Sequence, residues 1–403
     1  MKKVALSLLV ILFSTVTNSQ NNFENLWKKV QQFELENLPK SALTEVDIIY
    51  SKAKKENNSS QIIKSLLYKS KFALTLEEDA QLLIIKNLKQ EISKSSFPTR
   101  NILESIIADL YWQYFQQNRW KFYNRTSTEK KIDTTDFRTW DLKTIFSEVQ
   151  NHYNNSLSNS LEAQLTALDK FDEIIDTTKD SKVFRPTLYD FLAHRAIDFL
   201  QNEEQNITRP SYKFELDNEL LLGNNSDFTS QTITSKDSIS NHLKALKIYK
   251  NLTLFHLKDT NSTALINVTL ERLNFVKTNT VLNTKEELYL KALQTFKKEF
   301  KNHEASTEID FEIAKLLNDQ GKLYQPKTAT TNQFKLKEAL EICNTTIHNY
   351  PTSSGAKKCE LLKNEILSKY ISIQTENYVP ITTNARLLVT YKNLEKVYFT
   401  GFE

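Results

Sequence analysis

Glycine and proline are scarce in this chain. Its 403 residues include four glycines and seven prolines. Proteins built on β-sheets or on alternating strands and helices place glycine in many tight turns, so this scarcity disfavours both classes. The glycines also lie far apart, which leaves no glycine-rich phosphate-binding loop and no Gly-x-Ser-x-Gly nucleophile elbow. The composition therefore favours helices joined by polar loops.

The chain also lacks a marked excess of charge and a recognisable metal motif. Its 53 Lys and Arg are nearly balanced by 49 Asp and Glu, and the two signs are interspersed, so we expect no nucleic-acid partner. No His-Glu-x-x-His motif occurs. His194 and Asp198 have i, i+4 spacing, but with no third ligand the polar edge of a core helix is the simpler interpretation. We expect no catalytic residues, no metal and no cofactor, and hence not an enzyme.

No apolar run is long enough for a membrane span of about 18 to 20 residues. The longest run, residues 4–16, follows Lys2 and Lys3 and precedes a short polar stretch at 17–20. This order is typical of a secretory signal peptide. Residues 1–20 are therefore predicted to be a cleaved signal peptide. The mature chain is expected in the periplasm or cell envelope, with no transmembrane segment after cleavage.

From Phe23 to about Tyr370 the apolar residues recur at helical spacing. Ala42, Val46 and Ile49 line one helical face, and a polar break at 57–60 separates them from a second such face. Two helices joined by so short a loop lie antiparallel, as an αα-hairpin. The predicted fold class is mainly α: a tetratricopeptide-like α-solenoid of helical hairpins with a short C-terminal β segment.

The clearest hairpin is residues 334–367, where a helix ending in Tyr350-Pro351 is followed by a second helix that opens with small residues. This order resembles a tetratricopeptide-type repeat. Further helices are expected at 139–157, 160–177, 239–257, 262–278, 284–303 and 306–321.

The segment 205–238 is long and rich in Asn, Ser and Thr. Because such loops are uncommon inside compact domains, it is interpreted as a linker. The expected organisation is a first helical lobe at 21–204, this linker, a second helical lobe at 239–370 and a β segment at 371–403.

After residue 370 the pattern changes to alternation of apolar and polar residues, which predicts strands. The apolar positions fall in three groups: Ile371 and Ile373; Leu387, Val389 and Tyr391; Val397 and Phe399. Three strands cannot close a β-sandwich, which needs roughly seven, and they leave an unpaired edge. Residues 371–403 are therefore expected to begin a larger β-domain.

Several segments, taken in this order, resemble the N-terminal region of bacterial α2-macroglobulin-like proteins of the Bacteroidetes type. They are Leu38-Pro39-Lys40-Ser41-Ala42-Leu43, Trp140-Asp141-Leu142 with Tyr153 and Ser156-Leu157, Phe184-Arg185-Pro186-Thr187-Leu188-Tyr189-Asp190, Ile373-Gln374-Thr375-Glu376, Pro380, Arg386-Leu387-Leu388-Val389, Tyr391-Lys392-Asn393 and Val397-Tyr398-Phe399. The resemblance covers most of the chain, and it implies that the β segment opens a macroglobulin-type β-sandwich.

Proteins of this family resemble protease traps, in which a bait segment is cut and many members capture the attacker through a Cys-x-Glu-Gln thioester. Here Cys343-Asn-Thr-Thr and Cys359-Glu-Leu-Leu both depart from that pattern, and no bait segment can be placed. The resemblance thus implies a non-catalytic N-terminal scaffold of a cell-envelope protease inhibitor, whose partners are proteases or other envelope proteins. The alternative is a free-standing exported tetratricopeptide-like protein that binds envelope partners or glycans.

The two cysteines form a candidate disulfide. Cys343 and Cys359 each lie eight residues from Pro351, so antiparallel helices would bring them level. Packed helix axes are about 8–10 Å apart, and a disulfide needs Cα atoms within about 7 Å. An oxidising compartment favours the bond. The alternative is a pair of small buried thiols.

An aromatic cluster at 111–123 offers a candidate ligand site. Tyr111, Tyr114 and Phe115 continue a helical apolar face and are expected in the core. Trp120 and Tyr123 fall outside that register. Because exposed aromatic rings can stack on sugars or bases, these two are the candidate ligand contacts.

Overall fold

The computed structural model describes residues 23–125, 133, 135–178, 181–202, 212–237, 239–325 and 330–400. The expected signal peptide, residues 1–20, lies outside the described residues. Across those ranges, no helix combines the length and the apolar character that a membrane span requires.

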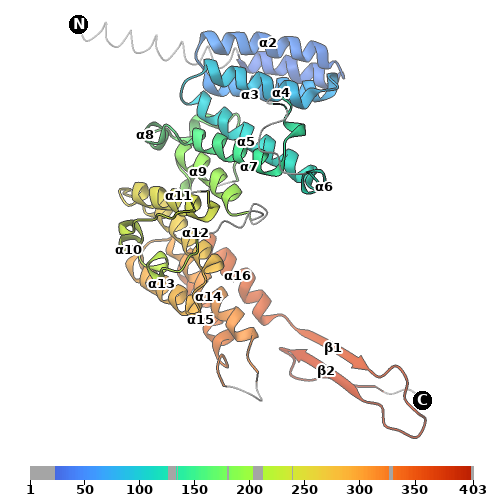
Figure 1. The fold of residues 1–403 in the computed structure, drawn as a ribbon. Coiled ribbons are helices and arrows are strands. Elements are labelled where there is room, and N and C mark those ends of the chain that lie inside the picture. Colours follow the sequence, from blue (N-terminus) through green and yellow to red (C-terminus); the bar gives the residue numbers. More distant parts are fainter. Residues whose placement is uncertain are drawn as a thin grey trace, which may run out of the picture. The chain divides into compact units, whose positions relative to one another are not determined.

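The fold is mainly helical, as predicted. Consecutive helices pack side by side in a repeat-like manner, and a two-stranded antiparallel sheet follows them (Figure 1). The chain divides into two compact units, Met1–Lys213 with Ser235–Ile248, and Phe214–Thr234 with Tyr249–Glu403. Residues 214–234, from the segment expected to be a linker, thus belong to the second unit.

The first unit begins with a helix at residues 23–35. Its other elements are α2 (Pro39–Lys55), α3 (Ser59–Leu76), α4 (Ala80–Lys94), α5 (Thr99–Gln117), α6 (Arg119–Tyr123), η1 (Phe137–Thr139), α7 (Leu142–Ser156), α8 (Ser160–Gln164), η2 (Leu168–Phe171), η3 (Ser181–Val183), α9 (Leu188–Leu200) and the first half of α11 (Asn241–His256).

Side-chain caps explain several of these boundaries. Asn58 accepts a hydrogen bond from the Gln61 backbone N–H at the start of α3. Asp141 accepts one from Thr144 at the start of α7. Thr187 and Asp190 form a reciprocal capping box on α9. Such caps satisfy N–H groups that a helix cannot pair internally.

The expected helix at 160–177 is wrong. Helix α8 ends at Gln164, and a short 3-10 helix covers Leu168–Phe171. Between them Ala167 forms a β-bridge with Thr187, and the Leu168 N–H donates to the Pro186 carbonyl at 2.9 Å. These long-range backbone bonds replace the helical bonds that a continuous helix would need.

The second unit carries the remaining helices and both strands. In chain order they are η5 (Glu219–Leu222), α10 (Asn225–Ser230), the second half of α11, α12 (Thr263–Asn279), α13 (Lys285–Glu299), α14 (Ser306–Lys322), α15 (Lys335–Asn349), α16 (Ser354–Leu367), β1 (Tyr370–Thr375) and β2 (Leu387–Lys392).

Arg272 of α12 ties residues 214–234 to the helices. Its fully buried guanidinium donates to the Leu221 carbonyl at 2.6 Å and to the Gly223 carbonyl at 3.1 Å. It also lies 4.5 Å from the Phe228 ring centre. Because a buried cation needs hydrogen-bond acceptors, these bonds hold η5 and α10 in place, although the Arg272 Nε–H has no acceptor among the described residues.

Helices α14 and α16 approach unusually closely at Gly355. A Cβ atom added there would lie 2.6 Å from the Glu308 nitrogen and closer still to the Thr307 carbonyl. Only glycine permits this distance, which sets the packing of α14, α15 and α16.

Strands β1 and β2 pair antiparallel, with Ile371 opposite Tyr391 and Ile373 opposite Val389. Two of the three predicted strands are therefore confirmed. Residues 397–399, expected as the third, are not in a strand. A strand needs a neighbour to pair with, and no described residue takes that place.

Candidate functional site

The main candidate site is the β1–β2 hairpin, because one of its faces is apolar. Residues directly opposite each other in an antiparallel pair share a face. The pairing therefore gathers Ile371, Ile373, Thr375, Leu387, Val389 and Tyr391 on one face. The other face carries Tyr370, Ser372, Gln374, Leu388, Thr390 and Lys392. The hairpin is amphipathic.

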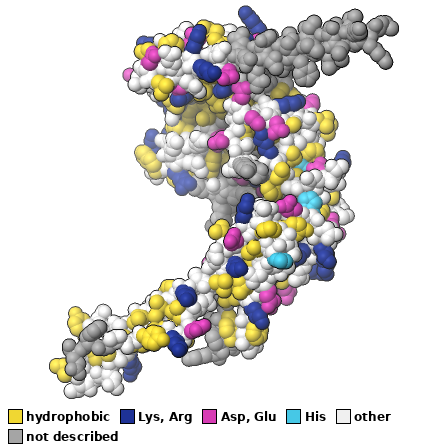
Figure 2. Space-filling model, turned by 180° about the vertical axis from the view of Figure 1, so that it is seen from behind, with side chains coloured by type: hydrophobic (Ala, Val, Ile, Leu, Met, Phe, Trp, Pro, Cys, Tyr) yellow, Lys and Arg dark blue, Asp and Glu magenta, His cyan; other side chains and the backbone are white. Residues whose placement is uncertain are grey.

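This apolar face is open to solvent. Ile371, Ile373, Leu387 and Tyr391 are between 44% and 61% exposed. Figure 2 shows hydrophobic side chains gathered at the surface over this end of the second unit. No described residue covers them. Exposed apolar side chains gathered on one face make the hairpin a candidate interaction surface.

The hairpin edges are equally unprotected. Natural edge strands usually carry charges or proline, which discourage pairing with another strand. Strand β1 has neither, and β2 has a single charge at its last residue, Lys392. Both edges can accept a further strand through backbone hydrogen bonds.

Two side chains fasten the hairpin to the end of α16. The Asn393 amide donates to the carbonyls of Ile366 and Ser368 at 2.7 and 3.0 Å. Lys392 donates to the Glu365 carbonyl at 2.9 Å. The Asn393 bonds satisfy carbonyls of the kind that a helix end leaves unpaired, and the Lys392 bond adds to those that Ser368 already donates to the Glu365 carbonyl. Asn393 adopts a φ of 55°, a left-handed conformation that Asn tolerates well.

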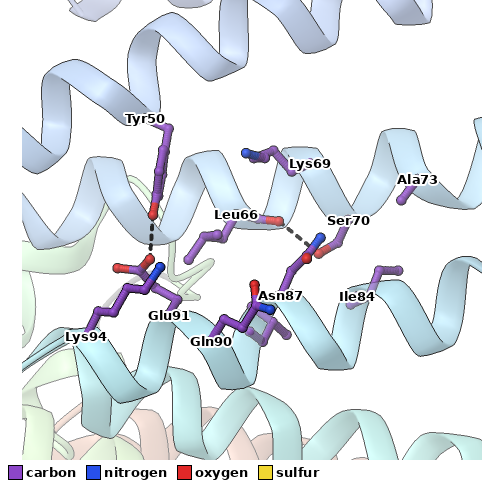
Figure 3. Close-up of a pocket in the computed structure, with 11 residues that line it drawn as sticks. Tyr50, Leu66, Lys69, Ser70, Ala73, Ile84, Asn87, Gln90, Glu91 and Lys94 are labelled. Carbon is purple, nitrogen blue, oxygen red and sulfur yellow. Dashed lines mark hydrogen bonds between the residues drawn. The ribbon is translucent and has the colours of Figure 1, made fainter. Parts of the chain in front are cut away.

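A second candidate is a cavity of about 170 Å³ between α2, α3 and α4 (Figure 3). Leu66 and Leu88 contribute apolar side chains to its lining. Lys69, Asn87 and Lys94 contribute polar groups. Lys69 is already paired with Asp47 at 2.7 Å.

The carboxylate at one end of this cavity, Glu91, is fully engaged. It accepts hydrogen bonds from Tyr50, from Lys54 at 2.7 Å and from Ser95 at 2.8 Å. Burial alone would raise the pKa of Glu91, but these donors outweigh it and hold the pKa below its usual range. Burial and the same carboxylate raise the pKa of Tyr50. A carboxylate so saturated joins α2 to α4 and is unsuited to act as a general base.

Glu91 was not among the residues predicted from the sequence. The sequence did offer one indication of its role, because Glu91 falls on the apolar face of α4, beside Leu88 and Ile92. A charge at a buried position needs a partner, and here the partner lies on α2.

The two candidate ligand aromatics are accessible. Trp120 is 65% and Tyr123 51% exposed, and the Lys121 ammonium lies 5.4 Å from the centre of the Trp120 ring. Tyr111 and Phe115 are buried in the core, as predicted, whereas Tyr114 is only half-buried. Ligand contact by Trp120 and Tyr123 stays a prediction.

The structure brings the two cysteines together. Cys343 of α15 and Cys359 of α16 are buried free thiols, hydrogen-bonded to each other. That bond lowers the pKa of Cys343, whereas the bond and burial raise the pKa of Cys359. The disulfide itself stays a prediction.

Metal ligation has no support in the part of the chain that the structure describes. There, no group of three or more His, Cys, Asp or Glu is arranged to hold an ion. His194 is buried, and its Nδ1 donates to the Asp190 carbonyl at 2.7 Å.

Comparison of the chain with protein-family models, with curated proteins and with solved structures gives no match.

Proposed function

We propose that this chain is the N-terminal scaffold and interaction region of a cell-envelope α2-macroglobulin-like protease inhibitor, and that it has no catalytic role of its own. The observation that carries the proposal is an amphipathic hairpin with an exposed apolar face, fixed to the end of a series of packed helices. The resemblance of several segments of the chain to that family is the second support for the proposal.

The distribution of apolar and polar residues over the two faces of the hairpin suits a place in a β-sandwich. When two sheets pack face to face, each contributes one apolar face and leaves the other to solvent. The face that holds Ile371 and Ile373 fits the inner position, and the face that holds Ser372 and Gln374 fits the outer one. Isolated two-stranded hairpins are marginal in water.

The size of the face argues against a complex held by the hairpin alone. Two six-residue strands cover a footprint of roughly 200 Å², given about 3.4 Å per residue and about 4.8 Å between strands. A stable interface buries about 800 Å² on each partner. The hairpin therefore suits a sheet that is extended by further strands.

The proposal assigns protein contacts to this chain and leaves protease capture to other parts of the inhibitor. Neither Cys343 nor Cys359 lies in a thioester sequence. Both are enclosed between helices. A buried thiol cannot reach an attacking protease, so covalent capture by this segment is not expected.

The test uses the natural protein, isolated from the cell envelope with an antibody against residues 23–125. We expect a polypeptide much larger than the 46.9 kDa of this chain. After challenge with a protease of broad specificity, the protease should lose activity on a large protein substrate and keep activity on a small peptide.

The chain of 403 residues alone is the control, and it should leave both activities unchanged. A natural protein of this same size that has no effect on the protease would contradict the proposal.

A second candidate function is glycan binding by a free-standing exported protein. The exposed Trp120 and Tyr123 favour it, because accessible aromatic rings stack on sugar faces. Trp120→Ala should then abolish retention on a column of immobilised envelope glycans. Tyr378→Ala, at an exposed aromatic in the segment between β1 and β2, is the matched control.

A further inference from the structure

The thiol pair lies at the junction of three helices in the second unit. Cys343 belongs to α15 and Cys359 to α16, and both side chains are fully buried. Thr346 of α15 lies near them, and its hydroxyl donates to Asp310 of α14 at 3.2 Å. The thiols thus face each other in a closed space formed by α14, α15 and α16.

The enclosure selects which reactions the thiols can undergo. Because both sulfurs are enclosed, a reagent in solution cannot reach either of them in the folded state. A bulky group attached to one thiol before folding would not fit between the helices. Cys343 on α15 and Cys359 on α16 lie eight residues on either side of Pro351, and both are fully buried between the paired helices, which places each sulfur beside the other. The reaction compatible with this packing joins the two sulfurs and adds no atoms.

We propose that Cys343 and Cys359 form an intramolecular disulfide while α15 and α16 fold together, and that this bond is a covalent clamp at the base of the β1–β2 hairpin. The inference is independent of what the hairpin binds.

The oxidant is a disulfide compound, and the step is two thiol–disulfide exchanges. The Cys343 thiolate attacks one sulfur of the oxidant, which forms a mixed disulfide and releases the first oxidant thiolate. The Cys359 thiolate then attacks the Cys343 sulfur and releases the second. Two electrons pass from the cysteine pair to the oxidant, and two protons end on its two sulfurs.

The clamp acts on α16, the helix that carries the hairpin. The carbonyls of Glu365, Ile366 and Ser368 at its end accept the bonds from Lys392 and Asn393. A bond from Cys359 to α15 restricts separation of α16 from α15. The hairpin is then presented from a fixed support.

The experiment refolds the full chain with a mixture of oxidised and reduced glutathione, and in parallel under reductant alone. Each sample is denatured with an alkylating reagent, and its intact mass and digested peptides are measured. Hydrogen exchange of α15 and α16 amides is compared between the two samples. Exchange in α2 and α3 is the internal reference.

We expect the glutathione sample to carry no alkyl group and to give a cross-linked peptide that joins Cys343 to Cys359. Closure of this loop should slow exchange in α15 and α16 by roughly a hundredfold relative to the reduced sample. The variants C343S and C359S, with C343A as a second choice if a serine variant does not fold, should show no redox dependence.

Two results would overturn the inference. One is alkylation of both cysteines, or glutathione on either, after oxidative refolding. The other is a disulfide that forms but leaves exchange in α15 and α16 unchanged, because the bond would then clamp nothing.

Discussion

Gly355 offers a direct test of the packing in the second unit. Gly355→Ala places a methyl group against α14, at 2.6 Å from the Glu308 nitrogen and closer to the Thr307 carbonyl. Optimal separations for such atoms are about 3.5–4.0 Å. Backbone atoms cannot rotate away as a side chain can, so α14 and α16 must move apart by about 1 Å.

The magnitude follows from two opposing terms. Overpacking a core by one methyl group costs about 1–3 kcal/mol, and more where backbone must shift. Removing a glycine from a helix recovers at most about 1 kcal/mol. The net expectation is destabilisation by about 2 kcal/mol, which is about a thirtyfold increase in the population of the opened state.

Hydrogen exchange with peptide resolution is the assay. Amides of α14 and α16 in Gly355→Ala should exchange about thirtyfold faster, while those of α2 and α3 should not change. Ser354→Ala, at the exposed neighbouring position, is the matched control and should behave as wild type. Unchanged exchange in Gly355→Ala would refute the argument that close backbone approach sets this packing.

Three further outcomes are expected. Glu91→Gln should destabilise α2–α4 by roughly 1–3 kcal/mol, because the Lys54 ammonium loses its charged acceptor; exposed Glu24→Gln, the control, should not. The pKa of Glu91 is lower in the folded state than its unfolded value of 4.5. The ionised side chain therefore stabilises the fold above pH 4.5, and this stabilisation is lost as the pH falls through the lower folded-state pKa. The melting temperatures at pH 7 and pH 3 should consequently differ less in Glu91→Gln than in the wild type. Arg272→Met should destabilise the protein by roughly 2–4 kcal/mol, because it leaves the buried carbonyls of Leu221 and Gly223 unpaired. Amide hydrogen exchange at residues 214–234 should become faster, and an unchanged exchange rate there would contradict this role of Arg272. A chain without residues 371–403 should keep its melting temperature and scatter less light; a large fall in melting temperature would show that the strands are part of the helical core.

Local periodicity predicted the helices well where one apolar face decides the fold. Ala42, Val46 and Ile49 share a buried face of α2, as their spacing indicated. The same rule failed at 160–177, because a bridge from Ala167 to Thr187 lies outside any local window. Residues 397–399 alternate like a strand, yet alternation alone supplies no neighbouring strand.

The charged residues inside the fold were the least predictable part of the candidate sites. Glu91 and Arg272 occupy positions that the helical register makes buried, and their partners come from distant segments. Sequence shows that such a charge needs a partner but not which residue supplies it. The cysteine pair was predictable because both partners lie on one hairpin around Pro351.

Three separate features converge on α16, and together they explain how a helical scaffold can present a small hairpin. Near its start, Gly355 lets the helix pack directly on the backbone of α14. In its middle, Cys359 faces α15. At its end, three carbonyls hold Lys392 and Asn393 at the close of β2. A force on the hairpin therefore passes through α16 into α14 and α15 and is resisted by their packing. Because the apolar face is small, its affinity for a neighbouring sheet depends on being held in one orientation beforehand, which removes part of the entropic cost of docking.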